Sequence, residues 1–529
     1  MKKIIINISF IILALIVPSC EDSFLDKKPY GILTAGNFYR NQEEIWEGLI
    51  VSYARASFSQ SGWDTPRFEL GDICSDDAHK GGESDNDQPH ISDLAYFRAL
   101  SNNRTLNDFW SRAYAGIYND NIIITKAPSA SYEDEELRKR HIAEARFLRA
   151  FRYFHLVRVF GGVPLVIRPV EFDENLNIPR STIEETYDFI KQDLLAAAED
   201  LPSVNNMDMT TEWGRSSREA ALGYLARAAI YFHDFELARD AAKEVIDCNY
   251  FELTPEFQDI FTQLDGSNKE SVVEFLNQDT KGNGNGTRLT IWYRSRNSQG
   301  YGFDCPTGDL ANEFEPGDPR RLFTIIDHGD KFPGSGSDIE IQNHTGYITG
   351  ELMHSRKIFL IKPLRSSRYG NDTKNIKDLR YSDILLIYAE ALLETGGDRQ
   401  VVCDYVNMVR ERARNSRKYD VEAYGNTPEE KKANRIFQVE NVDIPDVTVD
   451  MDLTVAIRHE RRVEFAMEYQ RFYDLKRWGY DYCRERLIQA RGDFGPVENN
   501  INPNKFSAYP IPQTEIDRTG GIVTQNPGW

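Results

Sequence analysis

The feature that most constrains this chain of 529 residues is the recurrence of apolar side chains at helical spacing over long segments. The longest segment spans residues 135–160, and from Ile142 onward it is apolar nearly all round, which is typical of a central, buried helix. It ends at Gly161, with Pro164 shortly after, a combination that terminates helices. The same spacing recurs in residues 41–58, 107–126 and 182–201. The pattern predicts a mainly α-helical fold.

Two further segments have the pattern of helix pairs. Residues 216–248 carry small side chains on both sides of a break near His233, and residues 381–413 contain a glycine pair beginning at Gly396. Small side chains let two antiparallel helices approach closely, as in tetratricopeptide repeats. Those of the first pair are Gly223, Ala226, Ala229, Ala238, Ala241 and Ala242. Because no strict period of about 34 residues runs through the sequence, we expect tetratricopeptide-like helix pairs separated by insertions.

The region between these pairs, residues 252–377, loses helical periodicity. Residues 271–276 and 357–361 have the composition of short strands, and they lie among loops rich in glycine and asparagine, such as residues 281–287. The sequence therefore predicts a helical-pair scaffold that carries a loop-rich lobe with a few short strands.

The first twenty residues have the pattern of an export signal. Lys2 and Lys3 precede an apolar run of about 14 residues, which is too short to span a bilayer comfortably and suits the core of a signal peptide. Ser19 followed by Cys20 matches a bacterial lipobox, in which the cysteine is acylated and becomes the mature N-terminus. We therefore expect a signal peptide at residues 1–19 and a lipid-anchor leader at 20–34. The alternative is an ordinary secretory signal with a chance cysteine.

Charge and cysteine content exclude several classes of partner. With 83 acidic and 63 basic side chains the net charge is -20, which argues against binding nucleic acid or adsorbing to anionic lipid. The six cysteines are scattered and form no CxxC pair, so neither a zinc ribbon nor a dense disulfide framework is expected. Membrane attachment then depends on Cys20.

Motifs that could support catalysis or metal binding are incomplete. His459-Glu460 begins like HExxH, but the second histidine is missing, so the arginines and glutamates of this segment are expected to form ion pairs. The loop at Gly282 lacks the GxGxxG spacing, and no GxSxG or P-loop motif occurs. Asp76-Asp77 and the acidic run at Asp85 lack the spacing of a calcium loop. We expect no catalytic residue, no metal and no cofactor.

Seven stretches, in order along the chain, resemble the SusD/RagB family of bacterial outer-membrane nutrient-binding lipoproteins. They are residues 25–29, 71–77, 143–165, 306–320, 379–396, 457–479 and 509–529. The resemblance covers essentially the whole mature chain. It implies one SusD-like body at residues 35–529, with a helical-pair scaffold at 35–250 and 378–480, a loop-rich ligand-binding lobe at about 251–377 and a C-terminal family segment at 481–529.

The resemblance also implies partners. Family members act as a lid over a TonB-dependent transporter of the SusC type, and their ligand is usually an oligosaccharide, or a peptide in the RagB branch. Family members place the ligand site on loops from two regions. In this chain both regions contain aromatic residues in loops.

Aromatic residues in those loops are the candidate ligand contacts, because sugars present flat C–H faces that stack on Trp or Tyr rings. The first region offers Trp63 and Arg67, and the second offers Trp292, Tyr293, Arg294, Tyr301 and Phe303. The alternative for each ring is a small apolar core within the loops. By contrast, aromatic residues at helical spacing are expected in the main core: Trp46, Trp110, Trp478, Phe147, Phe151 and Phe154.

Together these expectations describe a non-catalytic glycan-binding lipoprotein, anchored through Cys20 in the outer membrane. Glu21 and Asp22 resemble a surface-export signal, so the protein is expected to face the cell exterior. Two alternatives remain: a peptide-binding uptake lipoprotein, and a tetratricopeptide adaptor in which the loop aromatics are buried. An enzyme is a more distant alternative.

Overall fold

The fold was obtained as a computed structural model. It describes residues 38–57, 66–84, 86–169, 177–262, 268–277, 286–296, 300–327, 331–332, 339–340, 353–359, 371–416, 418–419, 437–438, 441–491 and 497–529. Cys20 and Trp63 lie outside these residues, so the predictions that rest on them stay predictions.

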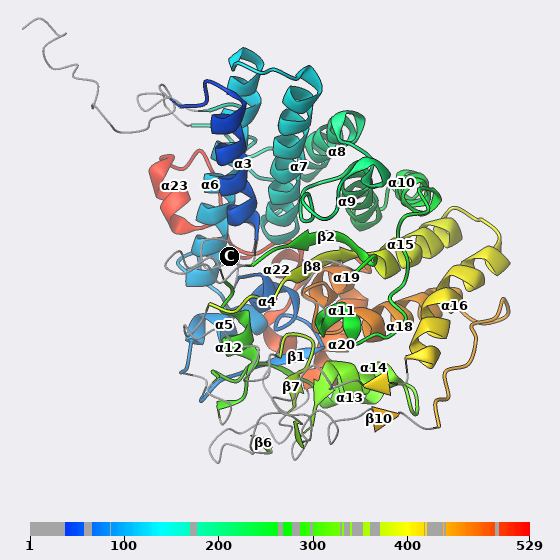
Figure 1. The fold of residues 1–529 in the computed structure, drawn as a ribbon. Coiled ribbons are helices and arrows are strands. Elements are labelled where there is room, and N and C mark those ends of the chain that lie inside the picture. The colour runs from blue at the N-terminus through cyan, green and yellow to red at the C-terminus, as the bar shows by residue number, and fades with distance from the viewer. Residues whose placement is uncertain are drawn as a thin grey trace, which may run out of the picture.

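A row of long helices forms the scaffold of the molecule (Figure 1). Its members are α3 (Gln42–Ala56), α6 (Arg104–Lys126), α7 (Glu135–Phe160), α8 (Ile183–Asp200), α9 (Arg218–Tyr231), α10 (Phe235–Asp247), α15 (Tyr381–Glu394) and α16 (Arg399–Asn415). Each helix from α6 to α10 packs on the next, then α10 packs on α15 and α15 on α16. The contact between α10 and α15 joins the two predicted parts of the scaffold, and the predicted mainly α-helical fold is confirmed.

The helices begin and end where local chemistry directs them. Asn41 and Asp134 accept hydrogen bonds from backbone N–H groups in the first turns of α3 and α7, and Thr182 and Glu185 form a capping box at α8. Helix α7 ends at Gly161, whose φ of 70° suits glycine, so the predicted stop is confirmed. Within the described residues, no helix combines the length and apolarity needed to cross a bilayer.

Small residues do more than bring α9 and α10 together. Ala238, Ala241 and Ala242 of α10 are buried, as expected of a close helix pair. A Cβ on Gly223 of α9, however, would lie 2.7 Å from the side chain of Leu379. Gly223 therefore brings α9 close to the strand that contains Leu379.

The second region consists of short elements, most of which lie below the scaffold in Figure 1; the red C-terminal helix lies beside the scaffold, at the left. Its helices are α4 (Pro66–Gly71), α5 (Pro89–Ala95), α11 (Asp259–Thr262), α12 (Leu289–Tyr293), α13 (Gly308–Glu313), α14 (Pro319–Thr324), α18 (Leu453–Phe465), α19 (Arg471–Arg477), α20 (Tyr480–Arg491), α21 (Val497–Asn500), α22 (Pro503–Ser507) and α23 (Gln513–Arg518). Two 3-10 turns lie at Ala127–Ser129 and Val204–Asn206.

The strands pair two by two, all antiparallel. The pairs are β1 (Ala78–Gly81) with β3 (Phe303–Pro306), β2 (Ser271–Phe275) with β8 (Ile376–Arg380), β4 (Ile325–Ile326) with β7 (His354–Ser355), β5 (Lys331–Phe332) with β6 (Ile339–Glu340), and β9 (Lys418–Tyr419) with β10 (Phe437–Gln438). The prediction of a strand at 271–276 is confirmed by β2. The pair β2–β8 lies directly beneath the scaffold in Figure 1, next to α9.

The prediction of a strand at 357–361 is wrong for its described residues, because Lys357 and Ile358 form a turn after β7. The Lys357 side chain is buried, and its ammonium group donates to the carbonyl of Glu464 at 2.9 Å and pairs with Glu468 at 2.6 Å. These long-range contacts hold the turn against α18, overriding an apolar composition that favours strand.

Buried ion pairs connect the two regions. Glu464 of α18 pairs with Arg380 at 2.7 Å and also with Arg412 and Arg320. Three different elements thus converge on one carboxylate, and although burial raises its pKa, the arginines hold that pKa well below its usual range. The charged residues of α18 therefore have the structural role expected from the sequence.

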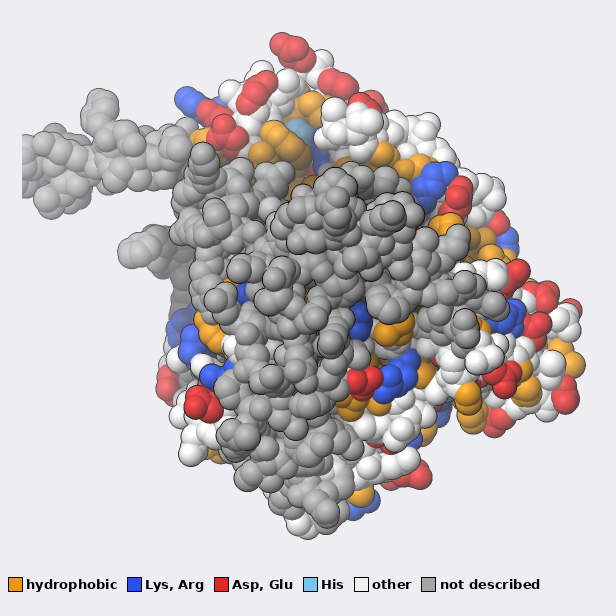
Figure 2. Space-filling view, turned by 60° about the horizontal axis from the view of Figure 1, so that its bottom comes forward, with side chains coloured by type: hydrophobic (Ala, Val, Ile, Leu, Met, Phe, Trp, Pro, Cys, Tyr) orange, Lys and Arg blue, Asp and Glu red, His pale blue; other side chains and the backbone are white. Residues whose placement is uncertain are grey.

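The pair Asp76-Asp77 belongs to the same kind of network. Asp76 accepts from Arg471 at 2.7 Å, and Asp77 accepts from Arg462 at 2.8 Å. Both carboxylates are fully buried, so they contribute to the interior rather than to a calcium loop. On the described part of the face in Figure 2, acidic and basic side chains are intermingled.

Candidate functional site

Three of the predicted aromatic residues come together in one cluster. The Trp292 ring lies 5.3 Å from the Tyr301 ring and 5.0 Å from the Phe303 ring, centroid to centroid. The Phe68 ring of α4 also packs against Trp292, with the ring centroids 5.8 Å apart. Trp292 and Tyr301 are half-buried, and the indole Nε1 of Trp292 has no acceptor among the described residues. The accessible part of this cluster consists of these two rings.

The other predicted contacts face inward. Tyr293 is 0% exposed, and burial raises its pKa well above the usual range. Phe303 and Arg294 are 2% and 3% exposed. Arg67 is also buried and forms an ion pair with Asp378. Burial of Tyr293 and Phe303 is what the adaptor alternative predicts for loop aromatics, whereas Trp292 and Tyr301 keep exposed area. Ligand contact by the predicted set stays a prediction.

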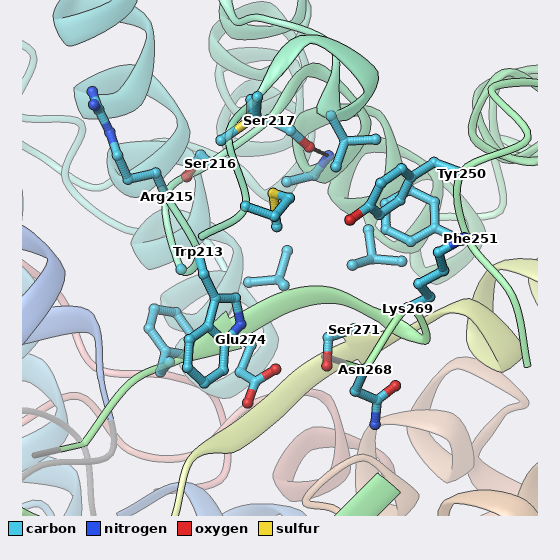
Figure 3. Close-up of a pocket in the computed structure, with 18 of the residues that line it drawn as sticks. Trp213, Arg215, Ser216, Ser217, Tyr250, Phe251, Asn268, Lys269, Ser271 and Glu274 are labelled. Atoms are coloured by element: carbon cyan, nitrogen blue, oxygen red, sulfur yellow. Dashed lines mark hydrogen bonds between the residues drawn. The ribbon is translucent and has the colours of Figure 1, made fainter. Parts of the chain in front are cut away.

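A hollow of about 340 Å³ lies between α3, the connection from α8 to α9, and the end of β2. We call it the Trp213 groove. Its walls are Trp46, Ile50, Tyr53, Ala54, Ser57, Thr211, Trp213, Gly214, Arg215, Glu274, Phe275 and Leu276. A smaller hollow of about 50 Å³ adjoins it and shares Tyr53, Trp213, Gly214, Arg215, Glu274 and Phe275 (Figure 3). The volume of the groove lies in the range that accommodates small ligands.

Hydrogen bonds to Tyr53 hold the connection that carries Trp213. The Tyr53 hydroxyl donates to Glu144 at 2.8 Å and accepts from the Ser216 backbone N–H at 2.9 Å. Arg215 donates from Nε to Glu144 at 3.1 Å. Helices α3 and α7 thereby position residues 213–216.

Stacking fixes the other wall of the groove. The Arg215 guanidinium lies 4.4 Å from the centroid of the Trp46 ring. The His141 ring also stacks on Trp46, with the two ring centroids 5.8 Å apart. Gly214 has a φ of 86°, and a Cβ there would lie 2.8 Å from Leu276. The turn after Trp213 therefore requires glycine.

Polar atoms on β2 and the turn before it are buried without hydrogen-bond partners among the described residues. Glu274 is 6% exposed; its Oε1 accepts from Lys377 at 3.1 Å, while its Oε2 has no partner among the described residues. The Ser271 hydroxyl and the Asn268 amide nitrogen, which line the smaller hollow, are likewise unpaired there. Figure 3 shows the Trp213 indole and the Glu274 carboxylate in the part of the wall that the two hollows share.

This arrangement suits a flat ligand that carries hydroxyl groups. Trp213 and Trp46 are half-buried, so each keeps part of an aromatic ring accessible. Glu274 provides an acceptor in the wall that the two hollows share, and Ser271 and Asn268 provide donors in the smaller hollow. Among the described residues, no group of three or more His, Cys, Asp or Glu side chains is arranged to hold a metal ion.

Comparison with protein families decides where the chain belongs. The model of the SusD family matches residues 249–529, which is more than half of the chain, and a second model, described as starch-binding associating with outer membrane, matches residues 23–231. The chain belongs to the SusD/RagB family. The resemblance seen in the sequence is thereby confirmed.

Individual SusD-like relatives match most or all of the chain. SusD-like protein P2 of Formosa agariphila is 27% identical over 100% of both chains, and a SusD-like protein of Bacteroides ovatus is 26% identical over 90% of this chain and 82% of its own. Among solved structures, surface glycan-binding protein A from Bacteroides fluxus is 25% identical with a TM-score of 0.71, covering 92% of this chain and 99% of that one. The same protein from Bacteroides thetaiotaomicron, in complex with laminarihexaose, is 22% identical with a TM-score of 0.73, at 92% and 99% coverage.

The residues of the Trp213 groove were not among the sequence-based candidates of this SusD-like chain. Trp46 was expected in the core, as was Trp478, but both are half-buried; Trp110, Phe147, Phe151 and Phe154 are buried as expected. A usable signal was the position of Trp213 in a polar, glycine-containing connection between two helices, residues 202–217. No sequence signal marks Glu274, because its role depends on what Lys377 leaves unpaired.

Proposed function

We propose that this SusD-like protein captures an oligosaccharide at the cell surface and delivers it, unchanged, to a TonB-dependent outer-membrane transporter of the SusC type. Membership of the family and the glycan-binding proteins among its structural relatives support this proposal. The observation that carries it is the Trp213 groove, whose wall contains a half-buried indole and a buried carboxylate oxygen with no partner among the described residues.

The energetics of the groove suit capture and release. Covering half of an aromatic ring removes roughly 50–100 Å² from water, which contributes about 1–2 kcal/mol per ring. Trp213 in the groove and Trp292 in the aromatic cluster offer two such surfaces, whereas Trp46 is already stacked by Arg215 and His141. Less the cost of ordering the ligand, these ring contacts alone correspond to a dissociation constant of about a millimolar or weaker, and such weak binding permits transfer to a transporter.

Attachment to the outer membrane through acylated Cys20 completes the proposal. The description of the family model that matches residues 23–231 includes association with the outer membrane, which supports this location. The protein acts without a cofactor, and the transporter supplies the passage across the membrane.

Isothermal titration calorimetry and affinity electrophoresis against a panel of polysaccharides test the function. We expect Trp213→Ala to lower affinity about tenfold or more, since it removes one ring contact and its shaping of the groove. Trp292→Ala measures the aromatic cluster separately. Tyr118→Ala is the matched control, because Tyr118 is an exposed ring on α6 that does not line the groove. The proposal would be contradicted if the protein bound peptides instead of glycan. It would also be contradicted if the protein released shortened products from the glycan.

A further inference from the structure

We infer that the Trp213 groove selects uncharged sugar units, with Glu274 as the residue that determines this specificity by accepting a hydroxyl hydrogen from the ligand. The inference rests on the proposed capture of glycans and goes further, because it names the chemical class of the ligand and the side chain that reads it.

Glu274 is held in place and only half satisfied. Its backbone lies in β2, its Oε1 is paired with Lys377 of β8 at 3.1 Å, and its side chain is 2% exposed in that pair. Glu274 belongs to the wall of the groove, and its Oε2 is buried without a partner among the described residues. A buried carboxylate oxygen without a donor is costly, so a ligand hydroxyl that reaches it gains a charge-assisted hydrogen bond.

The strand geometry explains why Glu274 reaches the groove. The register between β2 and β8 shifts between Ser271 and Val273, and again between Val273 and Glu274. Such irregularities break the alternation of side chains and turn one of them toward a new direction. Ser271 of the same strand adds an unpaired hydroxyl to the smaller hollow that adjoins the groove.

The cations around the groove are already paired. Arg215 donates to Glu144 at 3.1 Å and stacks on Trp46. Lys269, at the smaller hollow, pairs with Glu252 at 2.8 Å. Lys377 pairs with Glu274 itself. A carboxylate or sulfate on the ligand would therefore meet the charge of Glu274 without a free described cation to offset it.

A sugar unit that carries only hydroxyl or N-acetyl groups is not repelled by the charge of Glu274. Its hydroxyl or amide hydrogen can donate to Oε2, and its C–H face can cover the exposed part of the Trp213 ring. The groove therefore favours neutral glycans over uronic acid or sulfated ones.

Calorimetry with two hexasaccharide sets tests the inference on the full mature protein. The neutral set contains glucose hexamers of different linkages, and the acidic probe is hexagalacturonate. We expect at least tenfold tighter binding of one neutral hexamer than of the acidic one. E274Q, which keeps the size of the side chain and removes the charge, should lower neutral affinity about tenfold and reduce the discrimination.

E47Q, which removes one exposed charge from α3, is the matched control and should behave like the parent protein. If E274Q fails to fold because Lys377 is left unpaired, the double variant E274Q/K377M removes both charges and is measured instead. Equal or tighter binding of hexagalacturonate by the parent protein, or unchanged affinity in E274Q, overturns the inference while glycan capture stands. If neither neutral nor acidic hexasaccharides bind, the proposed function itself fails.

Discussion

Replacing His459 with glutamine is expected to remove a pH-dependent part of the stability of this fold. The imidazole of His459, on α18, bonds through Nδ1 to Glu313 at 2.7 Å and through Nε2 to Glu315 at 3.4 Å. These two acids lie at the end of α13 and just after it, so His459 fastens that segment to α18. The same histidine is the one that begins the incomplete HExxH motif.

The magnitude follows from the pKa of the imidazole. Burial alone lowers it, but the hydrogen bonds to Glu313 and Glu315 raise the pKa of His459 from 6.5 to about 9. A difference of this size corresponds to about 3 kcal/mol at 1.36 kcal/mol per pH unit. Because the folded state holds the proton more tightly than the unfolded state, this stability is fully present below pH 6.5 and is lost as the pH rises through 9.

Urea unfolding of the parent protein and of His459→Gln at pH 6 and at pH 9.5 measures the effect. The variant should be less stable by about 2–3 kcal/mol at pH 6 and nearly equal to the parent at pH 9.5. Glu313 keeps Arg462 at 2.8 Å and Glu315 keeps Arg410 at 2.5 Å, so the variant retains a paired segment.

Other buried groups do not obscure the comparison. Burial lowers the pKa of Lys374 and of Lys476 to about 7, so these lysines make the fold more stable as the pH rises above 7. Both proteins contain them, and the difference between the two proteins cancels their contribution. A difference in unfolding free energy that is the same at pH 6 and pH 9.5 would refute the role assigned to His459.

Two further predictions concern the groove and the anchor. Tyr53→Phe removes the hydroxyl that bonds Glu144 and the Ser216 backbone. Urea unfolding should therefore show a free energy of unfolding lower by about 1–2 kcal/mol, and calorimetry should show a weaker glycan affinity. An unchanged affinity would mean that Tyr53 does not position the Trp213 connection. Cys20→Ser removes the acylation site. Cell fractionation should then find the protein outside the membrane fraction, and palmitate labelling should be lost. A variant that stays in the membrane fraction would indicate another anchor.

Much of the scaffold could be predicted because its signals are local. Apolar spacing identified α7, and Gly161 marked its end, since helix termination depends on residues within one turn. The strand β2 was equally visible from its composition. The same reasoning failed at Lys357, where a buried ion pair with Glu468, three residues after the end of α18, outweighs local preference.

The candidate site was less predictable because exposure is not a local property. Trp292 and Tyr301 kept accessible area as expected, whereas Phe303, two residues after Tyr301 and of similar composition around it, is buried between β1 and α12. Whether a loop ring faces solvent or core depends on which distant segment packs against it. The sequence could identify the aromatic residues of the loops but could not show which of them are exposed and which are buried.

By itself the sequence determined the family, the helical-pair scaffold and the buried character of α7, since periodicity and motifs depend on neighbours along the chain. Only the tertiary structure brought Trp46, Trp213 and Glu274 from three separate segments to one groove. It alone also decided that Lys377, 103 residues further along the chain, covers one oxygen of Glu274 and leaves the other unpaired. Burial and pairing of this kind are set by packing between distant segments, and no local pattern encodes them.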